Sequence, residues 1–157
     1  MSNLVFYDFE TDSSNRYFGQ IIQIGAVLVN DDFQELDRFE ARCRLSPGVI
    51  PEAMALPVNR TSVKTLKETN LSHYEMIRQF VEKIKSWGRA VYIGFNNLEF
   101  DRPFLHVTLF KNLEYPYLTS TNGNSEGDLL GLSRAANLYY PKTLKNKTNS
   151  KGNLEYK

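Results

Sequence analysis

Two carboxylates stand one residue apart near the start of the chain, Asp8 and Glu10. They end a short apolar and aromatic run, residues 3–9, which is typical of a buried strand. Because strand side chains alternate between faces, both carboxylates should lie on one face, a few ångströms apart. Adjacent carboxylates repel unless a cation neutralises them, and hard oxygen ligands favour Mg²⁺ or Mn²⁺. The alternative interpretation is two exposed acids at a strand end.

A third carboxylate, Asp101, follows a second strand-like run at residues 90–95. It stands where a helix should begin, with Pro103 in the first turn. Asp101 could be the N-cap of this helix, or the helix N-terminus could keep it ionised. If the strand that carries Asp8 is the neighbour of the strand before Asp101, the three carboxylates converge at one sheet edge. Such convergence is what a two-metal phosphodiester site requires, with ions about 3.5–4 Å apart.

The elements around these residues begin with three strands in succession, predicted at residues 3–9, 20–29 and 33–45. A turn at residues 30–32 joins the second strand to the third. Short connections of this kind favour an antiparallel meander. A looser, proline-containing stretch follows.

The clearest helix is predicted to begin at Ser72 and to end at Gly88. Glu75 stands three residues after Ser72, which is a capping-box arrangement. A loop is expected over residues 113–127, and another helix after Asp128. The apolar residues of the first of these helices recur on one face: Ile77, Phe80, Val81, Ile84 and Trp87.

This order of elements predicts an α/β fold with a ribonuclease H-like mixed β-sheet, an antiparallel meander plus parallel strands, flanked by helices. At 157 residues the chain is sized for a single domain, residues 1–157. Its formal net charge of +1 neither favours nor excludes a nucleic-acid partner, because a binding groove needs only local positive charge. The one cysteine, Cys43, excludes an internal disulfide and is expected to be buried. Without a signal peptide or a membrane-spanning run, we expect a cytoplasmic protein with no membrane contact.

Three segments of the chain resemble the DEDD (DnaQ-like) 3′→5′ exonucleases: residues 6–11 (FYDFET), 20–26 (QIIQIGA) and 93–101 (IGFNNLEFD). The form Gly-aromatic-Asn-Asn in the third segment is closer to the exonuclease I branch than to the proofreading or ribonuclease T branches. Shorter matches to that branch are Phe110-Lys111-Asn112, Tyr115-Pro116-Tyr117 and Gly127-Asp128-Leu129-Leu130.

The resemblance implies hydrolysis of single-stranded DNA from its 3′ end, with two Mg²⁺ (or Mn²⁺) ions per site. Asp8, Glu10 and Asp101 would be the catalytic metal ligands. A single-stranded DNA-binding protein is an expected partner. For Phe9 and Phe95 a place in the core is expected rather than stacking on a base. Residues that would contact the substrate are Thr11, Leu56, Arg60, Thr61 and Asn97.

The chain departs from the family at its third motif, a histidine with an aspartate about five residues on, which is not present. We expect the chain to stop before that motif, with residues 153–157 beginning the helix that leads to it. His73 and His106 do not have the spacing to replace the missing histidine, so both are expected to be structural or exposed. The polypeptide should then be a poor nuclease, lacking a general base and one anionic ligand.

Basic residues near the carboxylates are expected to contact DNA. Arg60, Arg102 and the lysines of residues 142–151 are the candidates, although a solvated loop is the simpler interpretation of that lysine-rich segment. Two alternative functions stay open. One is a related exonuclease that acts on short RNA or on mispaired 3′ ends. The other is a fragment that binds nucleic acid without cleaving it.

Overall fold

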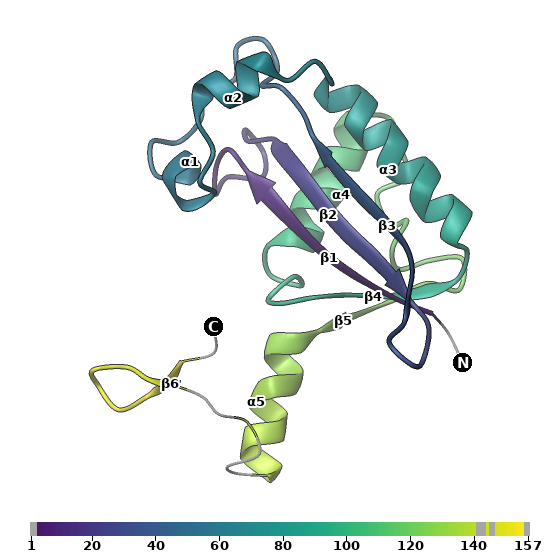
Figure 1. Ribbon diagram of the computed structural model, residues 1–157, viewed down its shortest axis with the longest axis vertical. Coiled ribbons are helices and arrows are strands. Elements are labelled where there is room, and N and C mark those ends of the chain that lie inside the picture. Colours follow the sequence, from purple (N-terminus) through teal and green to yellow (C-terminus); the bar gives the residue numbers. More distant parts are fainter. Residues whose placement is uncertain (1–2, 141–143, 145–146, 156–157) are drawn as a thin grey trace.

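A five-stranded mixed sheet forms the centre of the protein, with the strand order β3-β2-β1-β4-β5. The computed structural model describes residues 3–140, 144 and 147–155 (Figure 1). The first three strands form an antiparallel meander, whereas β4 runs parallel to β1 and β5 runs parallel to β4. The strands are β1 (Asn3–Thr11), β2 (Ile21–Val29), β3 (Glu35–Arg42), β4 (Ala90–Gly94) and β5 (Ser125–Asp128).

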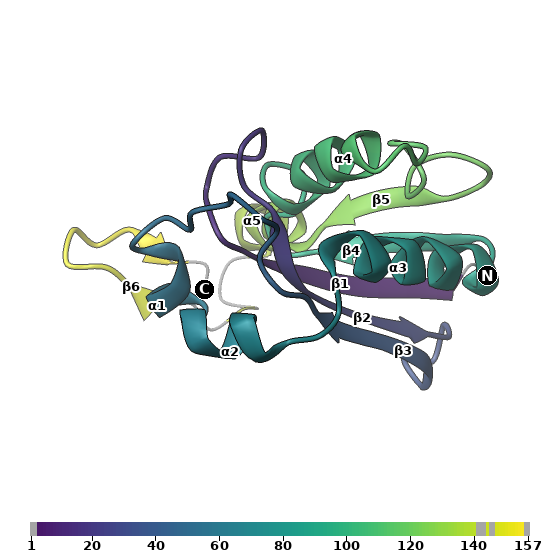
Figure 2. The same cartoon turned by 90° about the horizontal axis from the view of Figure 1, so that it is seen from above.

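Two long helices, α3 (His73–Trp87) and α4 (Asp101–Lys111), cover one face of this sheet (Figures 1 and 2). The capping box of Ser72 and Glu75 is present at the start of α3. The apolar side chains of α3 pack with those of α4 and the sheet into one core. Buried members of that core include Val5, Tyr7, Phe9, Ile24, Ile77, Phe80, Ile84, Tyr92, Phe104, Leu105 and Leu109.

The remaining elements lie around this sandwich. Two short helices, α1 (Ala55–Val58) and α2 (Val63–Glu68), lie near the end of the sheet at which β1 finishes (Figure 1). α5 (Leu129–Tyr139) follows β5 and extends away from the sheet, and none of its residues is buried. The hairpin of β6 (Lys147–Thr148) and β7 (Leu154–Glu155) follows α5 in the chain and lies to the left of it in Figure 1, apart from the central sheet.

The predicted fold class is confirmed, including the parallel pairing of β1 with β4. Three local predictions are wrong. Residues 125–127, expected in a loop, form most of β5. The segment Ser-Glu-Gly has a low strand propensity of its own, but the edge of β4 supplies it with hydrogen-bond partners. Residues 154–155 pair as a strand rather than beginning a helix, and the lysine-rich segment contains β6. The proline-containing stretch, for which no helix or strand is predicted, holds α1 and α2.

Among the described residues, no helix combines the length and the apolar character that crossing a lipid bilayer requires. Cys43 is fully buried, as expected. Burial raises the pKa of its thiol to about 12, so the thiol stays protonated at neutral pH.

Candidate active site at the end of the first strand

β1 sorts its side chains between the two faces of the sheet. Tyr7 and Phe9 are buried under the helices, whereas Asp8 is exposed and Glu10 is half-buried on the opposite face. This alternation is the period of two that the sequence predicts, and it places both carboxylates on the face that α3 and α4 leave open.

Asp101 reaches the same region from α4, of which it is the first residue. Its carboxylate Oδ1 accepts a hydrogen bond from the backbone N–H of Phe9, at 3.2 Å. The backbone pairing of β1 with β4 stops at Phe6 and Ile93, so Asp101 takes a strand donor that β4 no longer reaches. The N-cap position belongs to Phe100, which makes no side-chain capping bond. The carboxylate therefore ties α4 to β1 instead of capping its own helix.

The three acids line one hollow of about 440 Å³. They come from residues 93 positions apart in the sequence, and only the parallel pairing of β1 with β4 brings them together. The hollow is lined by Asp8, Phe9, Glu10, Thr11, Ser13, Ser14, Glu52, Met54, Ala55, Val58, Asn59, Phe95, Asn96, Phe100 and Asp101.

All three acids have a raised pKa. For Asp8 and Glu10 the main cause is partial desolvation by the surrounding protein, although the Asp8 side chain still reaches solvent, and the charge of Asp8 raises the pKa of Glu10 further. The pKa of Asp101 rises to about 7, first through burial and then through the charge of Asp8, with Glu10 contributing less. Mutual repulsion across the hollow is thus part of the cause, which means that a positive charge placed there would relieve it.

The anionic donors of this hollow fit a hard divalent cation such as Mg²⁺ or Mn²⁺, since they are carboxylate oxygens, with no thiol or imidazole among the lining side chains. Among the residues that the structure describes, no group of three or more His, Cys, Asp or Glu side chains already stands in an ion-holding arrangement. The hydrogen bond from Phe9 to Asp101 holds one of the candidate ligand oxygens.

The other predicted site residues divide between two hollows. Thr11 lines the carboxylate hollow, and its hydroxyl donates to the carbonyl of Ser13. Leu56, Arg60 and Thr61 line a neighbouring hollow instead. Glu52 lines both, which makes the two hollows adjacent.

Asn97 does not line either hollow. It is fully buried, and its amide Nδ2 donates to the hydroxyl of Tyr7 at 3.0 Å, beneath the carboxylates. Phe9 is buried in the core, as expected, but the same expectation is wrong for Phe95. The Phe95 ring is 45% exposed and lines the carboxylate hollow, because the chain turns at the end of β4 and carries the ring out of the sheet.

Sequence reasoning missed Glu52, which lines this hollow. Glu52 accepts hydrogen bonds from the Ser13 hydroxyl and from the backbone N–H of Ser14. Asn59, from the segment whose resemblance implies a nucleotide pocket, also lines the hollow and donates to the carbonyl of Thr11. These bonds hold the α1 segment against the end of β1. Glu52 is a lone acid in a proline-rich stretch, where no periodicity relates it to β1, so the sequence offers no signal for it.

The basic residues are placed differently from the expectation. Arg102 forms an ion pair with the nearly buried carboxylate of Glu126, at 3.5 Å, and Arg60 lines the neighbouring hollow. No lysine or arginine of the described ranges lines the carboxylate hollow. Of the predicted lysines, Lys142 and Lys145 lie outside the described residues, and Lys151 is exposed.

Neither histidine reaches the hollow. His106 packs edge-on against the ring of Tyr117, and His73 begins α3, where burial lowers its pKa to about 4.

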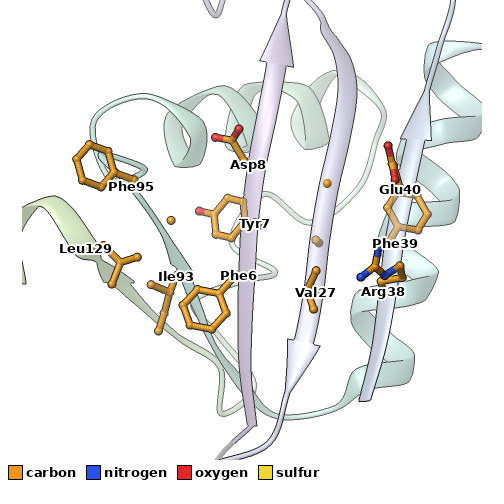
Figure 3. Close-up of a pocket in the computed structure, with 13 residues that line it drawn as sticks. Phe6, Tyr7, Asp8, Val27, Arg38, Phe39, Glu40, Ile93, Phe95 and Leu129 are labelled. Atoms are coloured by element: carbon orange, nitrogen blue, oxygen red, sulfur yellow. The ribbon is translucent and has the colours of Figure 1, made fainter. Parts of the chain in front are cut away.

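A third hollow, of about 480 Å³, lies on the open face of the sheet, beside the carboxylates. Figure 3 shows Phe6 on β1, Ile93 on β4 and Leu129 at the start of α5 along it. Asp8 and Phe95 line both this hollow and the carboxylate hollow. The carboxylates therefore border an apolar surface on one side.

The chain is similar in sequence to several curated proteins. No family model matches the chain. It is 26% identical to exodeoxyribonuclease I of Buchnera aphidicola subsp. Baizongia pistaciae over 139 residues. These residues cover 87% of this chain and 29% of the relative. It is 27% identical over 131 residues to exodeoxyribonuclease I of Haemophilus influenzae, which is 82% of this chain and 28% of that relative. The chain thus spans less than a third of the length of these curated relatives.

Solved structures with the same fold include E. coli exonuclease I in complex with a dT13 oligonucleotide, with a TM-score of 0.91, 18% identity, and coverage of 99% of this chain and 34% of that one. Another is exonuclease I from Methylocaldum szegediense, with a TM-score of 0.90, 21% identity, and coverage of 99% and 33%. A complex of exonuclease I with a C-terminal SSB peptide matches equally well, with a TM-score of 0.91. The comparisons confirm the predicted resemblance: the chain is similar in sequence to exodeoxyribonuclease I of the DEDD exonucleases and shares its fold.

Proposed function

We propose that this chain carries the carboxylate half of a metal-dependent 3′→5′ exonuclease site that acts on single-stranded DNA. The observation that carries the proposal is the convergence of Asp8, Glu10 and Asp101 on one hollow. The similarity to exodeoxyribonuclease I supports the reaction class and the substrate.

Two divalent ions would be held by Asp8, Glu10 and Asp101. When bound, such ions lower the pKa of a coordinated water and offset negative charge on the phosphate oxygens. The chain itself supplies the anionic ligands and the walls that orient the substrate. Around the acids these walls are apolar: Phe95 and Phe100 are at least a third exposed, and Met54 and Val58 more so.

These apolar side chains suit the sugar and base of a terminal nucleotide. Aromatic side chains at the rim of a hollow stack on bases without reading their sequence. The neighbouring hollow with Leu56, Arg60 and Thr61 would receive the next part of the strand, and the guanidinium of Arg60 would face phosphate.

The 157 residues place no imidazole in the hollow, because His73 and His106 both lie elsewhere. A general base typically contributes a factor of about 10²–10⁴. We therefore expect this polypeptide to bind Mn²⁺ and single-stranded DNA, with cleavage about 10²-fold or more below that of a complete site.

The experiment combines Mn²⁺ binding with single-turnover degradation of a 5′-labelled oligonucleotide. Asp8→Ala should abolish both Mn²⁺ binding and any cleavage, while Asp37→Ala, at a half-buried acid on β3 that does not line the hollow, serves as the matched control. RNA and mispaired-duplex substrates separate the alternative substrate classes. Binding of DNA without any Mn²⁺ affinity would sink the catalytic proposal and favour a binding module.

A further inference from the structure

Asp128 is an acid that lies outside the carboxylate hollow and contacts it through the backbone. It ends β5 and is the N-cap of α5, where Oδ1 accepts from the backbone N–H of Leu130 at 2.8 Å. The same carboxylate also accepts from the N–H of Asn96, at 3.0 Å to Oδ1, and of Leu98, at 3.2 Å to Oδ2. One side chain thus joins a helix N-terminus to a loop more than 25 residues away in the sequence.

The loop in question, residues 95–100, connects β4 to Asp101. It lines the hollow with Phe95, Asn96 and Phe100. Asn96 has a positive φ of 61°, a left-handed conformation that is uncommon outside glycine and that asparagine adopts more readily than most residues. The bond from Asp128 to the N–H of this same residue supplies one restraint on it.

The sheet register fixes where this carboxylate stands. Asp128 pairs with Gly94 in the parallel ladder of β4 and β5, so it sits level with the last strand residue before the loop. Burial raises the pKa of Asp128, but hydrogen bonds from the backbone of Leu98, Leu130, Asn96 and Gly131 outweigh it and lower the pKa overall. The group is therefore a carboxylate at neutral pH and accepts all of these bonds as an anion.

We propose that Asp128 is a positioning residue of the carboxylate hollow, whose carboxylate fixes the loop at residues 95–100 and thereby sets Phe95 and Asp101. The proposal rests on the proposed function only in assigning metal binding to the hollow. The restraint on the loop itself follows from the hydrogen bonds that the backbone N–H groups of Asn96 and Leu98 donate to Asp128. An isolated role as N-cap of α5 would need only the bond from Leu130.

Asp128→Ser separates the two roles. A serine hydroxyl is a good N-cap and can keep the bond from the N–H of Leu130, but it is one atom shorter and has one oxygen instead of two. Asp128→Asn is the conservative variant, because it keeps the length and one acceptor oxygen. Asp37→Ser is the matched control. The Asp37 carboxylate also accepts several hydrogen bonds, from Lys83, Trp87 and the N–H of Arg38, but it lies on β3, at the opposite edge of the sheet from β5.

The first measurement is amide hydrogen exchange in the metal-free chain. In Asp128→Ser the amides of Asn96 and Leu98 should exchange about tenfold faster, the expected effect of losing a hydrogen bond to a charged group. The amide of Leu130 should change little. The amide of Phe9, which donates to Asp101, reports the position of that carboxylate and should also exchange faster.

The second measurement is Mn²⁺ affinity by electron paramagnetic resonance. Partners that orient metal ligands typically contribute 10- to 100-fold in affinity, so Asp128→Ser should weaken Mn²⁺ binding about tenfold, Asp128→Asn less, and Asp37→Ser not at all. Unchanged exchange at Asn96, Leu98 and Phe9 would overturn the positioning role. So would loss of protection without loss of Mn²⁺ affinity. If the unmutated chain binds no Mn²⁺, the proposed function fails, and the Phe9 amide alone decides whether Asp128 positions Asp101.

Discussion

At the scale of single residues, the negative charge of the carboxylate hollow lowers the free energy of unfolding at neutral pH. Asp101 is 4% exposed, and burial together with Asp8 and Glu10 raises its pKa from 3.8 to about 7. Between these two values the folded chain binds a proton that the unfolded chain does not bind. The contribution of Asp101 to the free energy of unfolding is therefore greatest below about pH 4 and falls as the pH rises towards 7.

Asp101→Asn should remove this pH dependence, because an amide stays neutral and its oxygen can still accept from Phe9. In EDTA the variant should be more stable than the parent at pH 8, by about 1–3 kcal/mol, and the difference should shrink at pH 5. Urea denaturation at the two pH values measures this. Mg²⁺ should raise the stability of the parent and leave Asp101→Asn unchanged. A variant less stable than the parent at pH 8 would contradict the repulsion across the hollow.

A second effect at this scale concerns Gly94, the last residue of β4. A Cβ at this position would lie 2.7 Å from Cβ of Asn97 and 3.0 Å from the carbonyl oxygen of Tyr7. Gly94→Ala should therefore push the loop away from β1 and cost about 1–3 kcal/mol in urea denaturation. Gly131→Ala, in open space on α5, is the control and should be neutral or stabilising by up to about 1 kcal/mol. Equal effects at the two glycines would show that the close approach beneath the hollow is not rigid.

At the scale of elements, the α helices differ in how they are held. α3 buries six side chains, whereas α5 buries none and is attached through β5 and Asp128. Local opening free energies follow buried contacts, so α5 amides should exchange far faster than those of α3, by about 10²-fold or more. Exchange followed by mass spectrometry on peptic fragments measures this. Protection of α5 equal to that of α3 would mean that its exposed apolar residues are covered in solution.

The elements also show what the sequence could and could not predict. The meander, α3 with its capping box, and α4 were predictable because each has a strong local pattern, and the pairing of β1 with β4 brought Asp8, Glu10 and Asp101 together as expected. β5 was not predictable, since Ser125-Glu126-Gly127 is a strand only because β4 offers a free edge. The outward turn of Phe95 and the hydrogen bonds of Glu52 with Ser13 and Ser14 depend on backbone geometry at the ends of strands and helices. Local sequence patterns do not specify that geometry.

At the scale of the whole molecule, charge is arranged so that the candidate DNA surface is only weakly basic. The net charge is +1, and Arg60 is the cation that lines either of the two adjacent hollows among the described residues. Affinity for a single-stranded oligonucleotide should fall as salt rises, with a slope near −0.7 for each phosphate neutralised. Arg60→Ala should make this slope shallower by about that amount, while Arg89→Ala, just before β4 and at the end of that strand far from the hollows, should not. Fluorescence anisotropy between 50 and 200 mM salt tests both, and a salt-independent affinity would count against phosphate contact by Arg60.

The parallel pairing of β1 with β4 has a consequence for how the chain acquires its site. The meander of the first 42 residues can form from neighbours in sequence, but β4 must close a loop across some 80 residues before it meets β1. During synthesis, therefore, Asp8 and Glu10 leave the ribosome long before Asp101, and a nascent chain holds a half-built set of acids on an open sheet edge. If the three acids hold metal ions as proposed, these ions would not assist the early steps of folding, because the acids meet only after β4 has paired with β1.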